Sequence, residues 1–319
     1  MRMARPVAAP SLLLLAFLGG QATAQEARDW LERMSRAVED LNYRGTFVHV
    51  LDGTAETLYI VHRSADGQSG ERILSQGAGR EIIRRGDRVQ GILPDRRIVL
   101  FETRSDVSPL VSALPGTAAE LELHYDIQLG GGGARVAGRA VQILEIKPRD
   151  EFRYGYMLWL DQETAMPLQS QLVDEEGELV EQILFPEIEI PADIPAAALE
   201  PTIDTAGFTT LRAPDATPLA AEIPWRAADV PGGFRLSVAT QSAIAGSDTP
   251  VEHLVYSDGL ATVSVFIEDP ATKADLGEGF STVGSTNAYS LTLSGRKVTA
   301  MGEVPRQTVR TIASSLVAE

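Results

Sequence analysis

The side chains best suited to catalysis or metal binding are few and scattered along this chain. It has 319 residues, no cysteine and four histidines, each within a stretch that predicts a β-strand. None of the histidines has a second histidine or an acidic residue at the spacing typical of a metal site. We therefore predict no metal and no cofactor, and interpret all four as ordinary strand residues, namely His49, His62, His124 and His253.

Three short motifs resemble parts of catalytic or ligand-binding signatures, and none is complete. Ser257-Asp258-Gly259 lacks the G-x-S-x-G frame of a nucleophile elbow and has the composition of a hairpin turn. Residues 130–133 are four glycines without the Lys-Ser/Thr and the following helix of a phosphate-binding loop. The acidic residues 174–181 lack the spacing of a calcium loop. These motifs therefore supply no catalytic constellation.

Arginines gather in one part of a strongly acidic chain. Residues 71–104 hold eight arginines and five acids, whereas the formal net charge of the whole chain is −16. One interpretation is a patch for phosphate groups or an acidic peptide, because a guanidinium binds such groups through two hydrogen bonds. The other is ordinary strand charge, since only three of the 28 basic residues are lysines. The candidate residues for binding an anionic group, such as the head group of a lipid, are Arg72, Arg80, Arg84, Arg85 and Arg88.

Large apolar side chains exceed what one short helix would cover. Residues 154–160 predict a strand with two apolar faces, because successive side chains alternate across a strand. Something must therefore cover each face. One interpretation is a lipid- or peptide-binding cavity, and the other is a plain core plus a face between domains. The candidate cavity residues are Phe47, Leu93, Phe101, Tyr154, Tyr156, Met157 and Trp159.

The elements that would position these residues begin with an amphipathic helix. Apolar residues recur at three- and four-residue steps over residues 25–41, the stripe of a helix facing a core. The period then changes to two, and a series of about nine or ten antiparallel strands follows to about residue 190. A long meander must curl as strand twist accumulates, so we predict an unclosed barrel with the helix in its concave face. The predicted strands include 46–51, 58–63, 80–85, 89–93, 97–101, 121–129 and 135–147.

Both ends of this first domain, 25–190, have distinct compositions. Residues 1–24 combine Arg2 and Arg5 with a short apolar run and Ala22-Thr23-Ala24, which predicts a cleaved signal peptide and export to the periplasm. The apolar run is shorter than the roughly 20 residues that span a bilayer. A proline-rich linker is predicted over 191–222. The acidic balance argues against nucleic-acid binding.

A smaller second domain is predicted over 223–319. Asp258-Gly259 and Ser294-Gly295 each lie between two alternating stretches, which indicates two hairpins. Pro305 opens a terminal helix, where its missing N–H has no cost. The fold class is therefore α+β and mostly antiparallel β. The buried stripe of the helix would comprise Val309, Ile312, Ala313, Leu316 and Val317.

Longer motifs give the chain a family resemblance. They are NYRGTF at 42–47, GREIIR at 79–84, RYGYMLWLD at 153–161, VPGGF at 230–234, YSDGLATVSVFIE at 256–268 and GEVP at 302–305. With these motifs the chain resembles the periplasmic MucB/RseB family of negative regulators of the envelope-stress sigma factor. The resemblance covers nearly the whole chain after residue 24.

The resemblance implies a fold, a partner and a function that is not enzymatic. The first domain would be similar to the lipoprotein carriers LolA and LolB, and the second would bind the periplasmic region of a MucA/RseA-like membrane anti-sigma factor. That binding would shield the anti-sigma factor from site-1 proteolysis until lipopolysaccharide or another lipid releases it. The second-domain candidates for partner contact are Trp225, Phe234, Tyr256 and Phe266.

The sequence leaves open two alternative functions and two structural questions. A soluble carrier of lipids or lipoproteins would fit the first domain but would need no second domain. A hydrolase of envelope glycans would need a nucleophile or an acid pair that the motifs do not supply. The sequence does not decide between a monomer and a homodimer, nor how the two domains are oriented.

Overall fold

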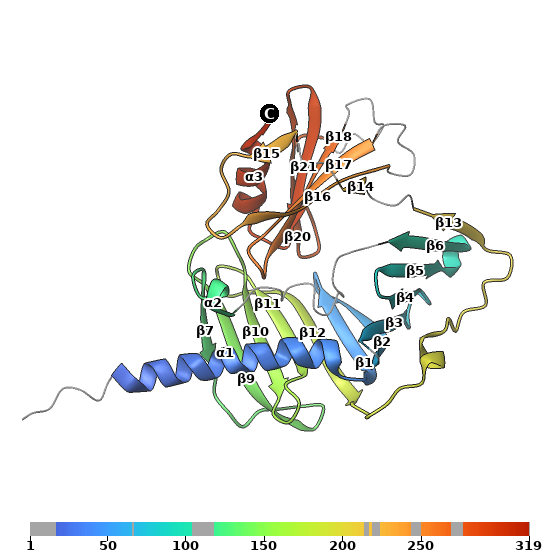
Figure 1. Ribbon diagram of the computed structural model, residues 1–319, viewed down its shortest axis with the longest axis vertical. Helices are drawn as coiled ribbons and strands as arrows, with labels where there is room; N and C mark the ends of the chain where they lie inside the picture. The colour runs from blue at the N-terminus through green and yellow to red at the C-terminus, as the bar shows by residue number, and fades with distance from the viewer. Residues whose placement is uncertain are drawn as a thin grey trace, which may run out of the picture.

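The computed structural model describes residues 17–65, 67–103, 118–213, 217–218, 224–243, 250–268 and 277–318. Two β-rich domains lie one above the other, and a long helix runs across the lower one (Figure 1). The prediction of a mostly antiparallel protein with a large first sheet, a smaller second sheet and a terminal helix is confirmed.

The first domain is built on one thirteen-stranded sheet in the order β13-β6-β5-β4-β3-β2-β1-β12-β11-β10-β9-β7, with β8 attached to β9. Its end strands β13 and β7 do not pair with each other, so the sheet remains unclosed within the described part of the chain. The strands are β1 (Tyr43–Leu51), β2 (Thr54–Ala65), β3 (Gln68–Ser75), β4 (Glu81–Arg85), β5 (Arg88–Leu93), β6 (Ile98–Thr103), β7 (Tyr125–Leu129), β8 (Arg135–Val136), β9 (Arg139–Pro148), β10 (Gly155–Asp161), β11 (Pro167–Val173), β12 (Leu179–Glu189) and β13 (Thr209–Arg212).

Helix α1 (Phe17–Asp40) covers the core face of this sheet. Its Leu31, Met34 and Val38 are buried against strand residues such as Phe47 and Leu160. The apolar stripe predicted for this helix is therefore the face that packs against the sheet. The helix begins at Phe17, however, and not at Gln25 as predicted. Residues 1–16 of the predicted signal peptide lie outside the described residues, and residues 17–24 belong to α1.

The predicted strand 121–129 is wrong in its first half. Helix α2 (Ala118–Leu121) ends there, and a turn follows in which the amide of His124 donates to the carbonyl of Leu121. Leu121 is buried and Leu123 is 69% exposed, so the alternating pattern does not place both on one core face. Here the alternating apolar pattern does not produce a strand, because the hydrogen bonds of a turn can pair the backbone N–H and C=O groups just as those of a strand would.

The second domain has a seven-stranded sheet in the order β14-β16-β17-β18-β21-β20-β19 and a separate pair, β15-β22. The hairpin at Asp258-Gly259 joins β17 to β18, and the hairpin at Ser294-Gly295 joins β20 to β21, as predicted. The elements are β14 (Thr217–Pro218), β15 (Trp225–Ala227), β16 (Arg235–Ala243), β17 (Pro250–Ser257), β18 (Thr262–Glu268), β19 (Gly279–Val283), β20 (Thr286–Leu293), β21 (Arg296–Gly302) and β22 (Leu316–Ala318).

The terminal helix α3 (Arg306–Ser314) packs on this sheet. Pro305 is the residue before the first helical turn, and Val309, Ile312 and Ala313 are fully buried. Val317 was predicted on the same stripe, but it lies in β22 and is 38% exposed. The helix therefore ends one turn earlier than its apolar pattern suggests.

The chain between the domains is fastened to the first domain, although its prolines predict an extended connection. Strand β13 pairs with β6 in parallel, and the short 3-10 helix η2 (Ala196–Leu199) packs beside β2 and β3. The buried carboxylate of Glu81 accepts hydrogen bonds from the amides of Thr202 and Ile203 and from the Thr202 hydroxyl. These bonds leave little freedom to this part of the linker.

Candidate functional site

A buried ion pair joins the two domains. Nη1 of Arg153 lies 2.5 Å from Oδ2 of Asp258, and both side chains are 0% exposed. The hydroxyl of Tyr125 donates to the same Oδ2 at 3.0 Å. Nη2 of Arg153 donates to the carbonyl of Gly232, while its Nε donates to Oδ1 of Asp150. Each nitrogen of this first-domain guanidinium thus makes a hydrogen bond, and two of the three bonds reach second-domain oxygens.

Asp258 has a second role within its own hairpin. Its Oδ1 accepts the backbone N–H groups of Leu260 and Ala261 at 2.8 and 2.7 Å, which closes the turn between β17 and β18. One carboxylate therefore shapes the second-domain turn and fixes it to the first domain. Burial, with a smaller contribution from the charge of Asp258, raises the pKa of Tyr125. Its hydroxyl stays protonated and remains a donor.

Further contacts extend the interface along residues 150–154. The side-chain amide of Asn287 donates to the hydroxyl of Tyr154 at 3.0 Å, and the hydroxyl of Thr308 donates to the carbonyl of Phe152 at 2.7 Å. The ring of His124 lies against Gly233, where a Cβ atom would come within 2.5 Å of it. Two segments of the second domain therefore meet residues 152–154, and a third, at Gly233, meets His124.

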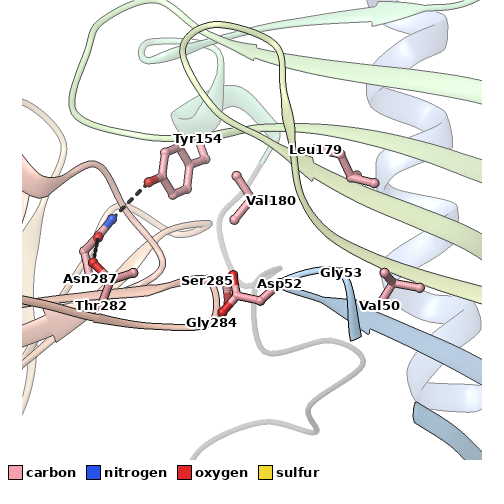
Figure 2. Close-up of a pocket in the computed structure, with 10 residues that line it drawn as sticks. All are labelled: Val50, Asp52, Gly53, Tyr154, Leu179, Val180, Thr282, Gly284, Ser285 and Asn287. Carbon is pink, nitrogen blue, oxygen red and sulfur yellow. Dashed lines mark hydrogen bonds between the residues drawn. The ribbon is translucent and has the colours of Figure 1, made fainter. Parts of the chain in front are cut away.

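A cavity of about 450 Å³ lies between the domains beside these contacts. Figure 2 shows that it is bordered by the β1–β2 turn, the start of β12, Tyr154 and the β19–β20 turn. Its polar groups are hydroxyls, an amide and one carboxylate, and its apolar groups are aliphatic side chains and the Tyr154 ring. The lining residues are Val50, Asp52, Gly53, Tyr154, Leu179, Val180, Thr282, Gly284, Ser285 and Asn287.

Titratable side chains lie next to this cavity. Nε2 of His49 is 2.7 Å from Oε1 of Glu181, and this hydrogen bond is the main reason why the pKa of His49 is raised. Oγ of Ser285 donates to Oε1 of Glu303 at 2.8 Å. Loss of hydration raises the pKa of Glu303, and the charge of Glu181 raises it further. A proton is therefore held more tightly on both His49 and Glu303 than in water.

The predicted cavity residues do not share one site. Phe47 is buried with its ring centroid 5.5 Å from that of Phe185, and Tyr156 and Trp159 pack against the same core under α1. Phe101 belongs to a separate cluster on β4–β6. Tyr154 lies at the domain interface, and Leu93 and Met157 are half-buried on β5 and β10.

The predicted arginine patch is largely paired within the fold. Nη1 of Arg72 lies 3.0 Å from Oε1 of the buried Glu81. Arg80 lies 3.6 Å from Glu56, and Arg85 lies 3.1 Å from Glu200 and also donates to the carbonyl of Leu199. The two others are half-buried or exposed, and Arg84 donates only to a backbone carbonyl, that of Gly86. Arg84 and Arg88 are therefore the members best placed to meet an external anion.

The predicted partner-contact aromatics lie mainly inside the second domain. Trp225, Phe234 and Tyr256 are 6%, 3% and 3% exposed, and Phe266 is half-buried, stacked on His253. Side chains that are buried to this extent can support a partner-binding surface from beneath, but they do not themselves form it. Phe234 nevertheless approaches the domain interface, with its ring 5.1 Å from the Arg153 guanidinium.

Sequence reasoning missed the interface residues Tyr125, Arg153 and Asp258. Tyr125 and Asp258 were interpreted as a strand residue and a turn residue, and Arg153 was noted only as part of the family motif RYGYMLWLD. Pairing between residues 105 positions apart leaves no trace in local periodicity. Among the described residues, no group of three His, Cys, Asp or Glu side chains is placed to hold a metal ion, and no helix is both long and apolar enough to cross a membrane.

Comparison with known proteins agrees with this two-domain arrangement. Residues 26–203 match the MucB/RseB N-terminal domain, and residues 220–317 match the MucB/RseB C-terminal domain. The chain is 34% identical over 312 residues to the sigma factor AlgU regulatory protein MucB of Pseudomonas aeruginosa, covering 96% of this chain and 95% of that protein. It is 27% identical to the sigma-E factor regulatory protein RseB of Haemophilus influenzae, covering 98% of each chain.

Two solved structures show the same fold. MucB in the complex of Pseudomonas aeruginosa MucA and MucB aligns with a TM-score of 0.72 at 32% identity, covering 92% of this chain and 99% of that chain. MucB bound to MucA(peri) aligns with a TM-score of 0.70, with the same identity and coverage. Since the matches span both domains and their order, the chain belongs to the MucB/RseB family.

Proposed function

We propose that this protein is a periplasmic negative regulator that binds the periplasmic region of a MucA/RseA-like membrane anti-sigma factor. The observation that supports this most is the match over both domains to MucB in a complex with MucA. A protein that shared only the first domain would support a carrier equally well. The regulator acts by binding and not by catalysis, in keeping with the names of its relatives as regulatory proteins.

The domain interface is the proposed centre of partner binding. The cavity is lined by residues of both domains, so a partner side chain placed there would contact both. The buried Arg153–Asp258 pair holds the two walls at one spacing. A ligand that binds only this arrangement stabilises it, and any change that separates the domains weakens that binding.

The proposed protection of the anti-sigma segment follows from its being bound to this protein. A protease must bind its substrate in an extended form, and a segment held between or along these domains is not available to it. We propose that the bound anti-sigma segment is protected from site-1 proteolysis in this way. The periplasmic location is proposed from the signal-like residues 1–24.

We propose that lipopolysaccharide or another lipid releases the partner. If a lipid binds the uncomplexed form better, it must lower the affinity for the partner by the same factor. The apolar core around Phe47, Tyr156 and Trp159 is the proposed acyl-chain region. Arg84 and Arg88 are the proposed phosphate contacts, because they are not paired with a carboxylate among the ion pairs described above.

A reconstituted cleavage assay tests the proposal. The anti-sigma periplasmic region from the same organism is incubated with its site-1 protease, with and without this protein, and then with added lipopolysaccharide. We expect slower cleavage with the protein and restored cleavage with lipid. Unchanged cleavage in every condition contradicts the regulator. Lipid transfer between vesicles without any effect on cleavage would instead support the alternative of a lipid or lipoprotein carrier.

A further inference from the structure

The second-domain sheet has two edges of very different character. One edge is β14, which has two residues and ends in Pro218. The other is β19, Gly279–Val283, with the sequence GFSTV and no charged residue or proline. Proteins usually protect an exposed edge with charges, proline, bulges or a very short strand, since its unpaired backbone groups attract other strands. Strand β19 uses none of these protections.

The turn after β19 determines which of its backbone groups point outward. Val283 and Thr286 flank a two-residue turn in which Gly284 has a φ of 60°, and Ser285 is not left-handed. Such a hairpin turn is closed by hydrogen bonds between the flanking pair. Hydrogen-bonded and non-hydrogen-bonded pairs alternate along an antiparallel ladder. The N–H and C=O groups of Thr282 and Phe280 therefore point away from β20, towards the edge of the sheet, where no other strand of the described residues pairs with β19.

Side chains on β19 offer apolar contacts to a neighbouring strand. Phe280 is 42% exposed, and its ring centroid lies 4.7 Å from that of Tyr289. Val283 is 80% exposed. The guanidinium of Arg306 lies 5.7 Å from the Phe280 ring centroid and donates to the Thr282 hydroxyl at 3.0 Å. This surface suits an extended segment with an apolar residue opposite Phe280.

The edge continues into the cavity between the domains. Thr282, Gly284, Ser285 and Asn287, from β19, its turn and β20, form the second-domain wall of that cavity. The first-domain wall opposite comprises Val50 of β1, Asp52 and Gly53 of the β1–β2 turn, Tyr154, and Leu179 and Val180 of β12 (Figure 2). A strand lying along β19 is therefore directed at a space that both domains enclose.

We propose that an extended segment of the partner adds to β19 as an eighth strand of the second-domain sheet. Its backbone hydrogen-bonds to Phe280 and Thr282, one apolar side chain packs on Phe280, and the next part of the segment enters the interdomain cavity. Strand addition of this kind obtains affinity from main-chain bonds and specificity from side-chain pockets. The inference rests on the proposed function, because the partner is the anti-sigma periplasmic region.

A proline substitution tests the strand addition with a matched control. In Thr282→Pro the outward N–H is lost, but the bonds from β19 to β20 remain, because residue 282 does not donate to β20. In Thr282→Val the same side-chain hydrogen bonds are lost and the N–H is kept. We expect Thr282→Pro to weaken binding of the anti-sigma periplasmic region by about tenfold relative to Thr282→Val, measured by titration calorimetry.

Hydrogen exchange on the unmodified protein provides a second measurement. We expect the amides of Phe280 and Thr282 to exchange more slowly in the complex than in the isolated protein, while the amide of Ser281, bonded to β20, changes little. This readout keeps the test valid even if Thr282→Pro does not fold, which circular dichroism would reveal.

The outcomes separate the two proposals. If the unmodified protein does not bind the anti-sigma region, the proposed function fails. If it binds, but Thr282→Pro and Thr282→Val bind equally and the Phe280 and Thr282 amides are not protected, only the strand addition is wrong. If Thr282→Pro instead abolishes self-association without affecting partner binding, the occupant of β19 is a second copy of this chain and the inference is overturned.

Discussion

Nη1 of Arg153 and Oδ2 of Asp258 lie 2.5 Å apart in the middle of the domain interface, with both side chains fully buried. A charge in such a place is tolerated only with a partner and further hydrogen bonds, because removal from water costs several kcal/mol for each ion. Here the Tyr125 hydroxyl and the Gly232 carbonyl complete the bonding. The pair therefore favours this orientation of the domains over any other that keeps the interface buried, because a misaligned interface would leave two buried charges without each other.

Replacing Arg153 by Met should be strongly destabilising. The change leaves the Asp258 carboxylate buried without its cation, which typically costs about 3–5 kcal/mol in the free energy of unfolding. Chemical denaturation followed by tryptophan fluorescence measures the effect. The matched control is Arg44→Met, which breaks the exposed Arg44–Glu189 pair and should cost at most about 1 kcal/mol. Equal effects of the two changes would contradict the assigned role of Arg153.

Gly233 is required at the interface for two separate reasons. Its φ is +88°, and a Cβ atom would lie 2.5 Å from the His124 ring. Gly177 has a φ of +82° with open space around its Cβ position. We expect Gly177→Ala to cost about 1–2 kcal/mol from backbone strain alone, and Gly233→Ala to cost more. The difference between their unfolding free energies measures the contact between domains. It should shrink when His124 is also replaced by Ala.

Glu81 should hold the linker against the first domain. Its fully buried carboxylate binds Arg72 and the residues at 202 and 203. In Glu81→Gln the negative charge is lost and Arg72 remains only partly bonded, so we expect a loss of about 2 kcal/mol of stability. We also expect faster limited proteolysis within residues 200–212. The control Glu200→Gln, at the exposed pair with Arg85, should change neither measurement.

The groups beside the interdomain cavity should make the fold more stable in mild acid. The pKa of His49 is raised in the folded state, so its pairing with Glu181 contributes fully below the unfolded pKa of about 6.5. That contribution is lost as the pH rises through the raised folded pKa. The pKa of Glu303 is also raised, so its ionisation begins to destabilise the fold above the ordinary carboxyl pKa of about 4.5 and does so fully above the folded value.

Urea denaturation across this pH range provides the measurement. We expect the unfolding midpoint to fall as the pH rises from about 5 to 8. His49→Gln should remove the part of the decline above about pH 6.5, and Glu303→Gln should remove the part at lower pH. The His62→Gln variant is a useful contrast, because burial lowers the pKa of His62 and its contribution has the opposite sign. A midpoint independent of pH in the unmodified protein would contradict the role of both groups.

Much of the local structure could be predicted because it depends on residues near each other in the chain. The Leu31, Met34 and Val38 stripe of α1 follows from a period of 3.6, and the Asp258-Gly259 turn follows from backbone preference. The first half of the strand predicted over residues 121–129 is wrong because a turn and a strand can share the same apolar pattern, while residues 125–129 do form β7. Strand β19 was missed because GFSTV is too short and too polar to show alternation.

The sequence by itself determined the elements, the two hairpins of the second domain, and the motifs that carry the family resemblance. The tertiary structure alone decided which residues form the site. Arg153 and Asp258 have no special feature in the sequence, and only the packing of the two domains makes them a buried ion pair. Arg72, predicted to bind an external anion, instead pairs with the buried Glu81. The physical reason is that desolvation depends on what covers a group in three dimensions. The local sequence does not reveal which distant residues will bury a side chain. An arginine in the same local sequence could therefore bind an external anion or pair with a buried carboxylate of its own fold.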